Sequence, residues 1–209
     1  MKRRLLTGLG VLLGVLVLAT LGALAMPSRW EAGARCEIGS PTEAVVPWVS
    51  TAEAWPRWLG WEADLDGQLR WAAGPDGTMV WSGPRLGEGA LAVVATGGLS
   101  WDVTLAPAEG VAWHGQLVLE PSERSTAVSW TTSGDYGALP WSRFLGGAPG
   151  DRARDRMQRA LSRLERAVES TLAREAREAA AREAAEEADR RAQADIEAQN
   201  AAGERAAGD

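Results

Sequence analysis

The chemistry that this sequence offers most clearly is that of the indole ring. Its 209 residues include 11 Trp but only one Phe and one Tyr. Four tryptophans fall on one face of alternating strand patterns: Trp81, Trp101, Trp113 and Trp130. With Tyr136, in a loop expected at the mouth of a cavity, they predict an aromatic wall that binds an apolar ligand. The same indoles could instead fill a closed core, and both interpretations stay open; each buried indole N–H needs an acceptor in either case.

Residues suited to catalysis are few and scattered. His114 is the only histidine, and alternation places it opposite Trp113 on the outer face, which argues against a histidine-rich metal site or a catalytic triad. Asp135 could position or protonate a substrate, but an Asp that follows Gly is also a common turn former. Cys36 alternates to the inner face of a first strand, where it fits as a small hydrophobic residue. We therefore assign no catalytic residue, no metal ligand and no cofactor.

A two-residue period of apolar side chains is expected to position the tryptophans. From residue 64 to residue 133, apolar and polar residues alternate, and glycine-containing turn signals recur: Asp66-Gly67, Asp76-Gly77, 83–89 and 97–98. This pattern predicts an antiparallel sheet with one buried face.

Short elements are expected before the sheet. Residues 30–38 read as a first strand, and a short helix opens at Pro41 with Ser40 as its N-cap. A second short helix is expected near residues 51–59, with Pro56 in its first turn or breaking it.

A long helix starting at Asp151 is expected to cover the apolar face of the sheet. Its apolar residues recur at three- and four-residue spacing: Met157, Leu161, Leu164, Val168 and Leu172. Residues 173–209 are rich in Ala, Glu and Arg and lack the regular hydrophobic residues of a coiled coil. They predict a solvated helical tail, and the sequence indicates no partner for it.

Residues 1–28 have the pattern of a transmembrane anchor or a signal segment. Lys2, Arg3 and Arg4 precede an uncharged run from Leu5 to Ser28, which is long enough to cross a bilayer as a helix. By the positive-inside rule, the N-terminus would be cytoplasmic and the domain outside. Cleavage near Ala25 is the alternative, and it would release a secreted or periplasmic protein.

The charge of the chain argues against nucleic-acid binding. The net charge is −6, and no basic stripe interrupts the middle of the sequence. Such a surface repels a phosphate backbone.

Several segments together resemble the SRPBCC superfamily, in its START-like, polyketide cyclase/dehydrase form. Residues 38–45 resemble an I-x-A-P-x-E-x-V motif, and residues 55–58 stand where an aromatic pair is common. Residues 126–130 resemble a T-x-V-x-W signature, and residues 161–169 resemble the closing L-x-x-L-K-x-x-x-E helix. The resemblance covers residues 29–172. It implies an α+β helix-grip fold, in which a curved antiparallel sheet wraps around a long C-terminal helix and leaves a cavity for lipid-like or polyaromatic ligands. It supplies no shared catalytic residue.

Three functional hypotheses follow. The first is membrane-anchored binding or transfer of a hydrophobic, lipid-like small molecule in that cavity. The second is a cyclase/dehydrase-type or hydrolytic enzyme on the same fold, although no paired carboxylates or nucleophile–base pair are evident. The third is a structural or interaction protein with a filled core.

Overall fold

The computed structural model describes residues 29–108, 112–135 and 149–207, with side chains up to 193, and a few positions between 14 and 22. The predicted anchor, residues 1–28, lies almost entirely outside these described residues. No helix within the described parts of the chain is long and apolar enough to cross a membrane.

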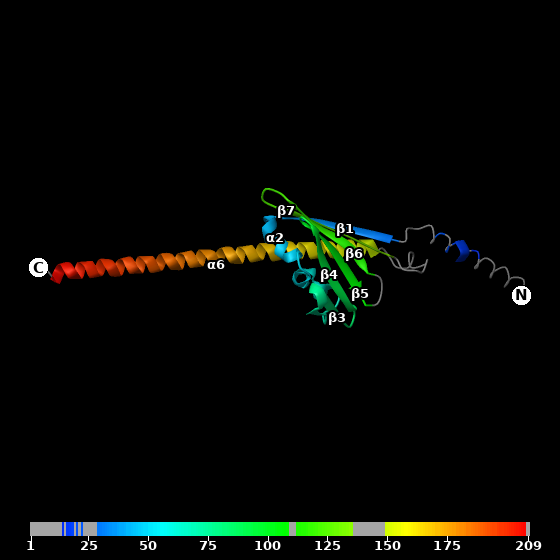
Figure 1. Cartoon of the computed structure of the whole chain (residues 1–209), viewed down its shortest axis with the longest axis horizontal. Helices are drawn as coiled ribbons and strands as arrows, with labels where there is room; N and C mark the ends of the chain where they lie inside the picture. Colours follow the sequence, from blue (N-terminus) through cyan, green and yellow to red (C-terminus); the bar gives the residue numbers. More distant parts are fainter. Residues whose placement is uncertain are drawn as a thin grey trace, which may run out of the picture. The chain divides into compact units, whose positions relative to one another are not determined.

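The chain begins its described fold with one strand, continues with short helices and a meander of strands, and then forms one long helix (Figure 1). The elements are, in order, β1 (Arg29–Ile38), α2 (Thr42–Val49), η1 (Ala52–Ala54), α3 (Pro56–Leu59), α4 (Trp61–Asp64), β2 (Arg70–Ala73), η2 (Pro75–Gly77), β3 (Met79–Gly83), β4 (Gly87–Gly97), β5 (Ser100–Pro107), β6 (Trp113–Pro121), β7 (Thr126–Asp135) and α6 (Pro149–Ala207).

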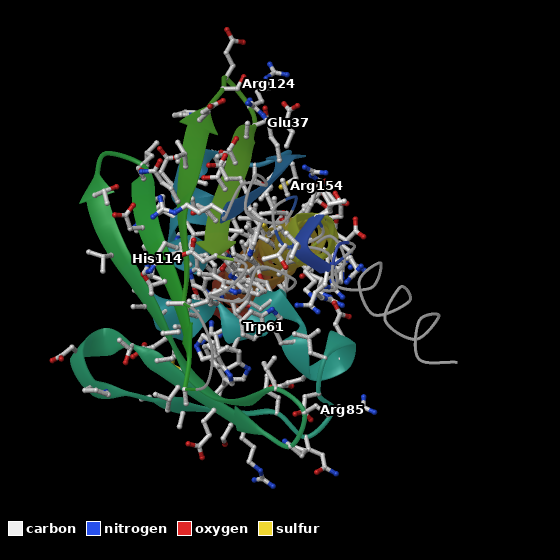
Figure 2. The ribbon with its side chains drawn as sticks, turned by 90° about the vertical axis from the view of Figure 1, so that its right-hand side faces the viewer. Glu37, Trp61, Arg85, His114, Arg124 and Arg154 are labelled. Carbon is white, nitrogen blue, oxygen red and sulfur yellow. The ribbon has the colours of Figure 1, made fainter. Side chains whose placement is uncertain are left out.

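One seven-stranded sheet of order β1-β7-β6-β5-β4-β3-β2 organises the domain. All its pairings are antiparallel, and β1 closes onto β7 along its whole length, from Arg29 opposite Asp135 to Ile38 opposite Thr126. Figure 2 shows the strands curving around the helix, with the β6–β7 turn at Arg124 and the β3–β4 turn at Arg85 at opposite ends of the domain. This is the helix-grip arrangement, and it confirms the predicted α+β fold class.

The buried face of the sheet meets the first part of α6. Alternation in β5 buries Trp101, Val103 and Leu105, while Asp102 between them is exposed. The facing side of α6 is apolar at three- and four-residue spacing, as the sequence predicted, and its buried residues are Ala153, Met157, Ala160, Leu161, Leu164 and Val168.

The short helices follow the sequence with one correction. Pro56 occupies the first turn of α3, where its missing N–H costs nothing, and Gly60 ends the helix in the left-handed conformation at φ 68°. Ser40 is not the N-cap of α2, because Pro41 holds that position without a side-chain hydrogen bond. Ser40 is instead buried, and its carbonyl accepts a hydrogen bond from the Thr126 hydroxyl at 2.9 Å.

The two Asp-Gly pairs behave differently. Asp76 and Gly77 turn the chain between β2 and β3 with φ of 54° and 73°, as a hairpin requires. Asp66 and Gly67 form no hairpin. The buried Asp66 carboxylate accepts hydrogen bonds from the backbone N–H groups of Gln68 at 3.1 Å, Arg85 at 2.7 Å and Leu86 at 3.2 Å, and so fixes the β3–β4 turn.

The chain divides into two compact units, Met1–Val168 and Glu169–Asp209. The second unit is helical through Ala207, and its side chains from 173 to 193 are all exposed.

Candidate functional site

A cavity of about 90 Å³ lies between the sheet and α6. Helix α4 and the loop after it provide Trp61 and Leu65. Four lining residues between 153 and 160 come from the first part of α6. The remaining wall comes from the strands and their turns. The described lining residues are Trp61, Leu65, Trp81, Leu86, Leu105, Pro107, Trp113, Trp130, Thr132, Ala153, Arg156, Met157 and Ala160. We call this cavity the indole pocket.

The described wall of the indole pocket is almost wholly apolar. Arg156 is its only charged side chain and Thr132 its only hydroxyl. The Thr132 hydroxyl donates to the carbonyl of His114 at 3.3 Å, so it is already partnered within the sheet. Neither a carboxylate nor a histidine or cysteine contributes to this part of the wall.

Tilted and edge-on contacts with other indoles support the tryptophans on one side of the pocket. Trp61 meets Trp81 edge-on, with ring centroids 5.3 Å apart, and both contact Trp71 of the edge strand β2 at 5.7 Å. Trp130 is met edge-on by Trp55 at 5.3 Å. Edge-to-face pairs add stabilisation beyond the area they bury, so these rings form a firm wall.

The indole N–H groups divide into two sets. Trp55 donates to the carbonyl of Val49 at 3.1 Å, and Trp58 donates to that of Trp48 at 2.9 Å. Trp81 and Trp130 both line the pocket, and their buried Nε1 atoms have no acceptor among the described residues. A buried donor without an acceptor costs about 1–3 kcal/mol of folding free energy. Both indole N–H groups therefore lack the acceptor that their burial requires.

Arg156 is half-buried and has neither a hydrogen bond nor an ion pair with another described residue. Burial lowers the pKa of its guanidinium, the charges of Arg152 and Arg159 lower it further, and Asp64 acts in the opposite direction. The guanidinium stays charged in spite of this. The pocket wall therefore includes one charged guanidinium that has no carboxylate partner among the described residues.

The pocket contains most of the predicted wall. Trp81, Trp113 and Trp130 line it, whereas Trp101 is buried in the sheet core and is not among the lining residues. Tyr136 lies outside the described residues. Trp61 and Arg156 were not predicted as wall residues. The first lies in a four-residue helix too short for a periodic signal, and the second reads as one more arginine on a charged helix face.

The other candidate residues lie away from the pocket. His114 is exposed, as predicted, and its Nδ1 lies 3.3 Å from the Thr104 hydroxyl in an open polar groove on the outer face of the sheet. In Figure 2 Trp61 lies near the centre of the domain, whereas His114 lies on the side formed by the strands. Asp135 ends β7 and forms an ion pair with Arg29 at 3.5 Å.

Cys36 is half-buried on β1, and burial, followed by the nearby charge of Glu165, raises the pKa of its thiol to about 11. A thiol with so high a pKa is a poor nucleophile at neutral pH. Among the described residues there is no cluster of His, Cys, Asp and Glu suited to hold a metal ion.

Comparison with known proteins identifies the fold. No family model matches the chain, and no curated protein matches it significantly. Among solved structures, it is similar to a protein from Thermus thermophilus, with a TM-score of 0.52 and 17% identity over 68% of this chain and 99% of that one. It is also similar to norcoclaurine synthase from a Thalictrum species, with a TM-score of 0.51 and 10% identity over 68% of this chain and 97% of that one.

A conserved protein from Geobacillus kaustophilus gives a TM-score of 0.51 and 11% identity, over 68% of this chain and 97% of that chain. At these identities the likeness extends to the backbone arrangement alone. It supports the helix-grip fold.

Proposed function

We propose that the sheet and the first part of α6 form a domain that binds a small hydrophobic molecule in the indole pocket. One observation carries this proposal: Trp81 and Trp130 line an apolar cavity with indole N–H groups that have no acceptor among the described residues. In the same domain, Trp55 and Trp58 are fully buried and both have backbone acceptors. In a closed protein core, buried donors almost always have an acceptor. Two unpaired indole N–H groups therefore favour a binding site, in which a ligand oxygen accepts their hydrogen bonds.

The size of the cavity limits the ligand. Its volume of about 90 Å³ is smaller than the roughly 150 Å³ cavity that holds a benzene molecule in an engineered protein. Both unpaired nitrogens are also closed to water in this arrangement. A ligand therefore has to move the indoles slightly as it enters, and a body of one ring or a few carbons requires the least movement.

Binding rather than catalysis is the function that the described wall supports. General acid–base catalysis needs a group with a suitable pKa within hydrogen-bond reach of the substrate. Apart from the indole N–H groups, the described lining residues offer Thr132 and Arg156 as their only polar side chains, and the Thr132 hydroxyl is already bonded within the sheet.

We also propose that residues 1–28 tether this domain to a membrane. The support is the uncharged run from Leu5 to Ser28 behind three basic residues. A tether would raise the effective concentration of ligands that partition into the bilayer. Fractionation tests this proposal: the full chain should sediment with membranes, and a chain starting at Arg29 should not. If expression of the full chain instead yields a soluble protein that has been cut and starts near Met26, the tether is contradicted.

A space-filling variant tests the binding function. Ala160 is buried on α6 and lines the pocket, so Ala160→Leu should occupy the space that a ligand needs. Native mass spectrometry of the purified full chain should show a small hydrophobic adduct in the wild type and none in Ala160→Leu. Ala173→Leu, at an exposed position of the same helix, is the matched control and should keep the adduct. Equal adducts in the wild type and Ala160→Leu would place the molecule elsewhere and contradict the proposal.

A further inference from the structure

The charge beside the indole pocket points to the chemical class of its ligand. We propose that the ligand is a small amphipathic carboxylate whose apolar body lies against the apolar wall of the pocket and whose carboxylate oxygens accept hydrogen bonds from Arg156 and from the indole N–H groups of Trp81 and Trp130. This inference rests on the proposed function and adds a substrate class to it.

Asp64 of α4 is shared by two arginines of α6, Arg159 and Arg163. Asp64 binds Arg163 in a two-pronged arrangement, with Nη2 2.7 Å from Oδ1 and Nη1 3.0 Å from Oδ2. Arg159 takes a further place, with Nε 3.3 Å from Oδ2. Both oxygens of Asp64 are thus already in use.

Arg156 lies on the same helix, one turn before Arg159 and Ala160, and it lines the pocket instead of pairing with Asp64. Its neighbours on the cavity wall are Ala153, Met157 and Ala160, which are all buried. Removing part of a guanidinium from water without an anionic partner costs free energy. A carboxylate in the pocket would remove that cost, because a guanidinium matches a carboxylate with two parallel N–H···O bonds.

A monoanion fits this site better than a phosphate. A phosphate group brings close to two negative charges and several oxygens that need donors, whereas the described wall supplies one cation. The rest of the wall is made mainly of indoles, aliphatic side chains and a proline, which favours an uncharged apolar body. That body could be an alkyl chain, as in a short fatty acid, or an aromatic ring.

Matched pairs of acid and amide test the inference. Calorimetric titration of the full chain in mild detergent would use phenylacetate against phenylacetamide for the aromatic body, and hexanoate against hexanamide for the alkyl body. Three variants accompany the wild type: Arg156→Gln, Arg156→Lys, and Arg154→Gln as a matched control. Arg154, labelled in Figure 2, lies on the same helix but is exposed. It pairs with Asp151 at 3.2 Å.

We expect the wild type to bind at least one acid about tenfold or more tightly than its amide, the range of a hydrogen-bonded charge. Arg156→Gln should lose this preference while its affinity for the amide stays within about twofold. Arg156→Lys should keep part of the preference, because it retains the charge but not the planar donor fork. Arg154→Gln should behave as the wild type. Whether phenylacetate or hexanoate binds more tightly shows whether the pocket prefers an aromatic or an alkyl body.

Three negative results are possible, and they have two different meanings. Equal binding of acid and amide to the wild type would overturn the carboxylate assignment and leave the hydrophobic pocket standing. Loss of acid preference in Arg154→Gln but not in Arg156→Gln would also overturn it. Failure of all four probes to bind to the wild type would count against the proposed function itself.

Discussion

Asp64 of α4 and Arg163 of α6 hold the short helices against the long one through two hydrogen bonds of 2.7 and 3.0 Å. Arg163 also donates to the carbonyl of Leu59 at 3.1 Å, and its guanidinium lies over Gly60, where a Cβ would collide with it. Gly60 is therefore required twice, for its positive φ and for this close approach. The contact sets the position of Trp61, the next residue, on the wall of the indole pocket.

Breaking this contact should destabilise the domain. The two side chains keep 26% and 19% of their exposure, so the pair lies between a surface and a buried ion pair. We expect Arg163→Met to lower the free energy of unfolding by about 1–2 kcal/mol. Arg154→Ala, which removes the exposed pair with Asp151, should change it by less than about 0.5 kcal/mol. Chemical denaturation measures both, and equal effects would contradict the special role of Arg163.

The same pair predicts a pH dependence. The hydrogen bond from Arg163 holds the pKa of Asp64 below its ordinary value of 3.8, against the opposing effect of burial. A depressed pKa in the folded state adds stability that is present above pH 3.8 and is lost as the pH falls through the folded-state pKa. The melting temperature of Asp64→Asn should therefore lie below that of the wild type at neutral pH. The two should converge as the pH falls below 3.8, and a gap that stays constant would contradict the assignment.

Asp66 should matter through its acceptor oxygens. Burial acts to raise the pKa of its carboxyl, but hydrogen bonds from three backbone N–H groups outweigh it, and the pKa lies below its ordinary value. Asp66→Ala leaves the N–H groups of Gln68, Arg85 and Leu86 unpaired and should lower the melting temperature strongly. Asp66→Asn keeps one acceptor oxygen and should have a smaller effect. Equal melting temperatures for the two variants would mean that packing, not hydrogen bonding, is the role of this residue.

Gly89 allows Trp81 its place in the pocket wall. The two residues are opposite each other in β4 and β3, and a Cβ on Gly89 would overlap the Trp81 indole. We expect Gly89→Ala to cost about 1–3 kcal/mol of stability and to weaken ligand binding, because the ring has to move into the pocket. Gly67→Ala is the control, since its Cβ would meet nothing within 4 Å. An unchanged ligand affinity in Gly89→Ala would show that the position of Trp81 does not matter for binding.

The C-terminal tail should be dispensable for folding. The first compact unit ends at Val168, and side chains from 173 to 193 are exposed. Ending the chain at Ala173 should shift the melting temperature of the domain by no more than a few degrees. A drop of about 10 °C or more, on the scale of a few kcal/mol, would show that the tail contributes to the core.

The sequence predicted the sheet and the helix better than it predicted the pocket. Apolar and polar residues alternate along strands β5, β6 and β7, and α6 has a regular apolar stripe. The buried faces of the sheet and of the helix could therefore be predicted from the sequence. Strand β4 begins at Gly87, inside the turn expected at 83–89, because glycine and alanine give its first half little hydrophobic contrast. Asp66-Gly67 lies at a turn but forms no hairpin, and the sequence could not show this because the partners of Asp66, Arg85 and Leu86, are distant along the chain.

Alternation of apolar and polar residues predicts which face of the sheet a side chain occupies. It does not predict how far that side chain lies from a cavity on the same face. Trp101 and Leu105 share the inner face of β5, yet Leu105 lines the pocket and Trp101 does not. Four steps along a strand cover about 13 Å, so one of these side chains can reach a small cavity while the other lies beyond it. The same limit explains Arg156, whose contact with the cavity depends on where the sheet crosses the helix.

The unpaired indole N–H groups allow the most direct test of ligand binding. In ¹H–¹⁵N spectra of the ¹⁵N-labelled protein, each Trp gives its own indole signal, and replacement of single tryptophans assigns them. Titration with phenylacetate or hexanoate should move the signals of Trp81 and Trp130 downfield as their N–H groups gain an acceptor, while those of Trp55 and Trp58 stay in place. If all four signals stay unchanged at saturating concentrations of both acids and both of their amides, the indole pocket is a filled core and the central claim is wrong.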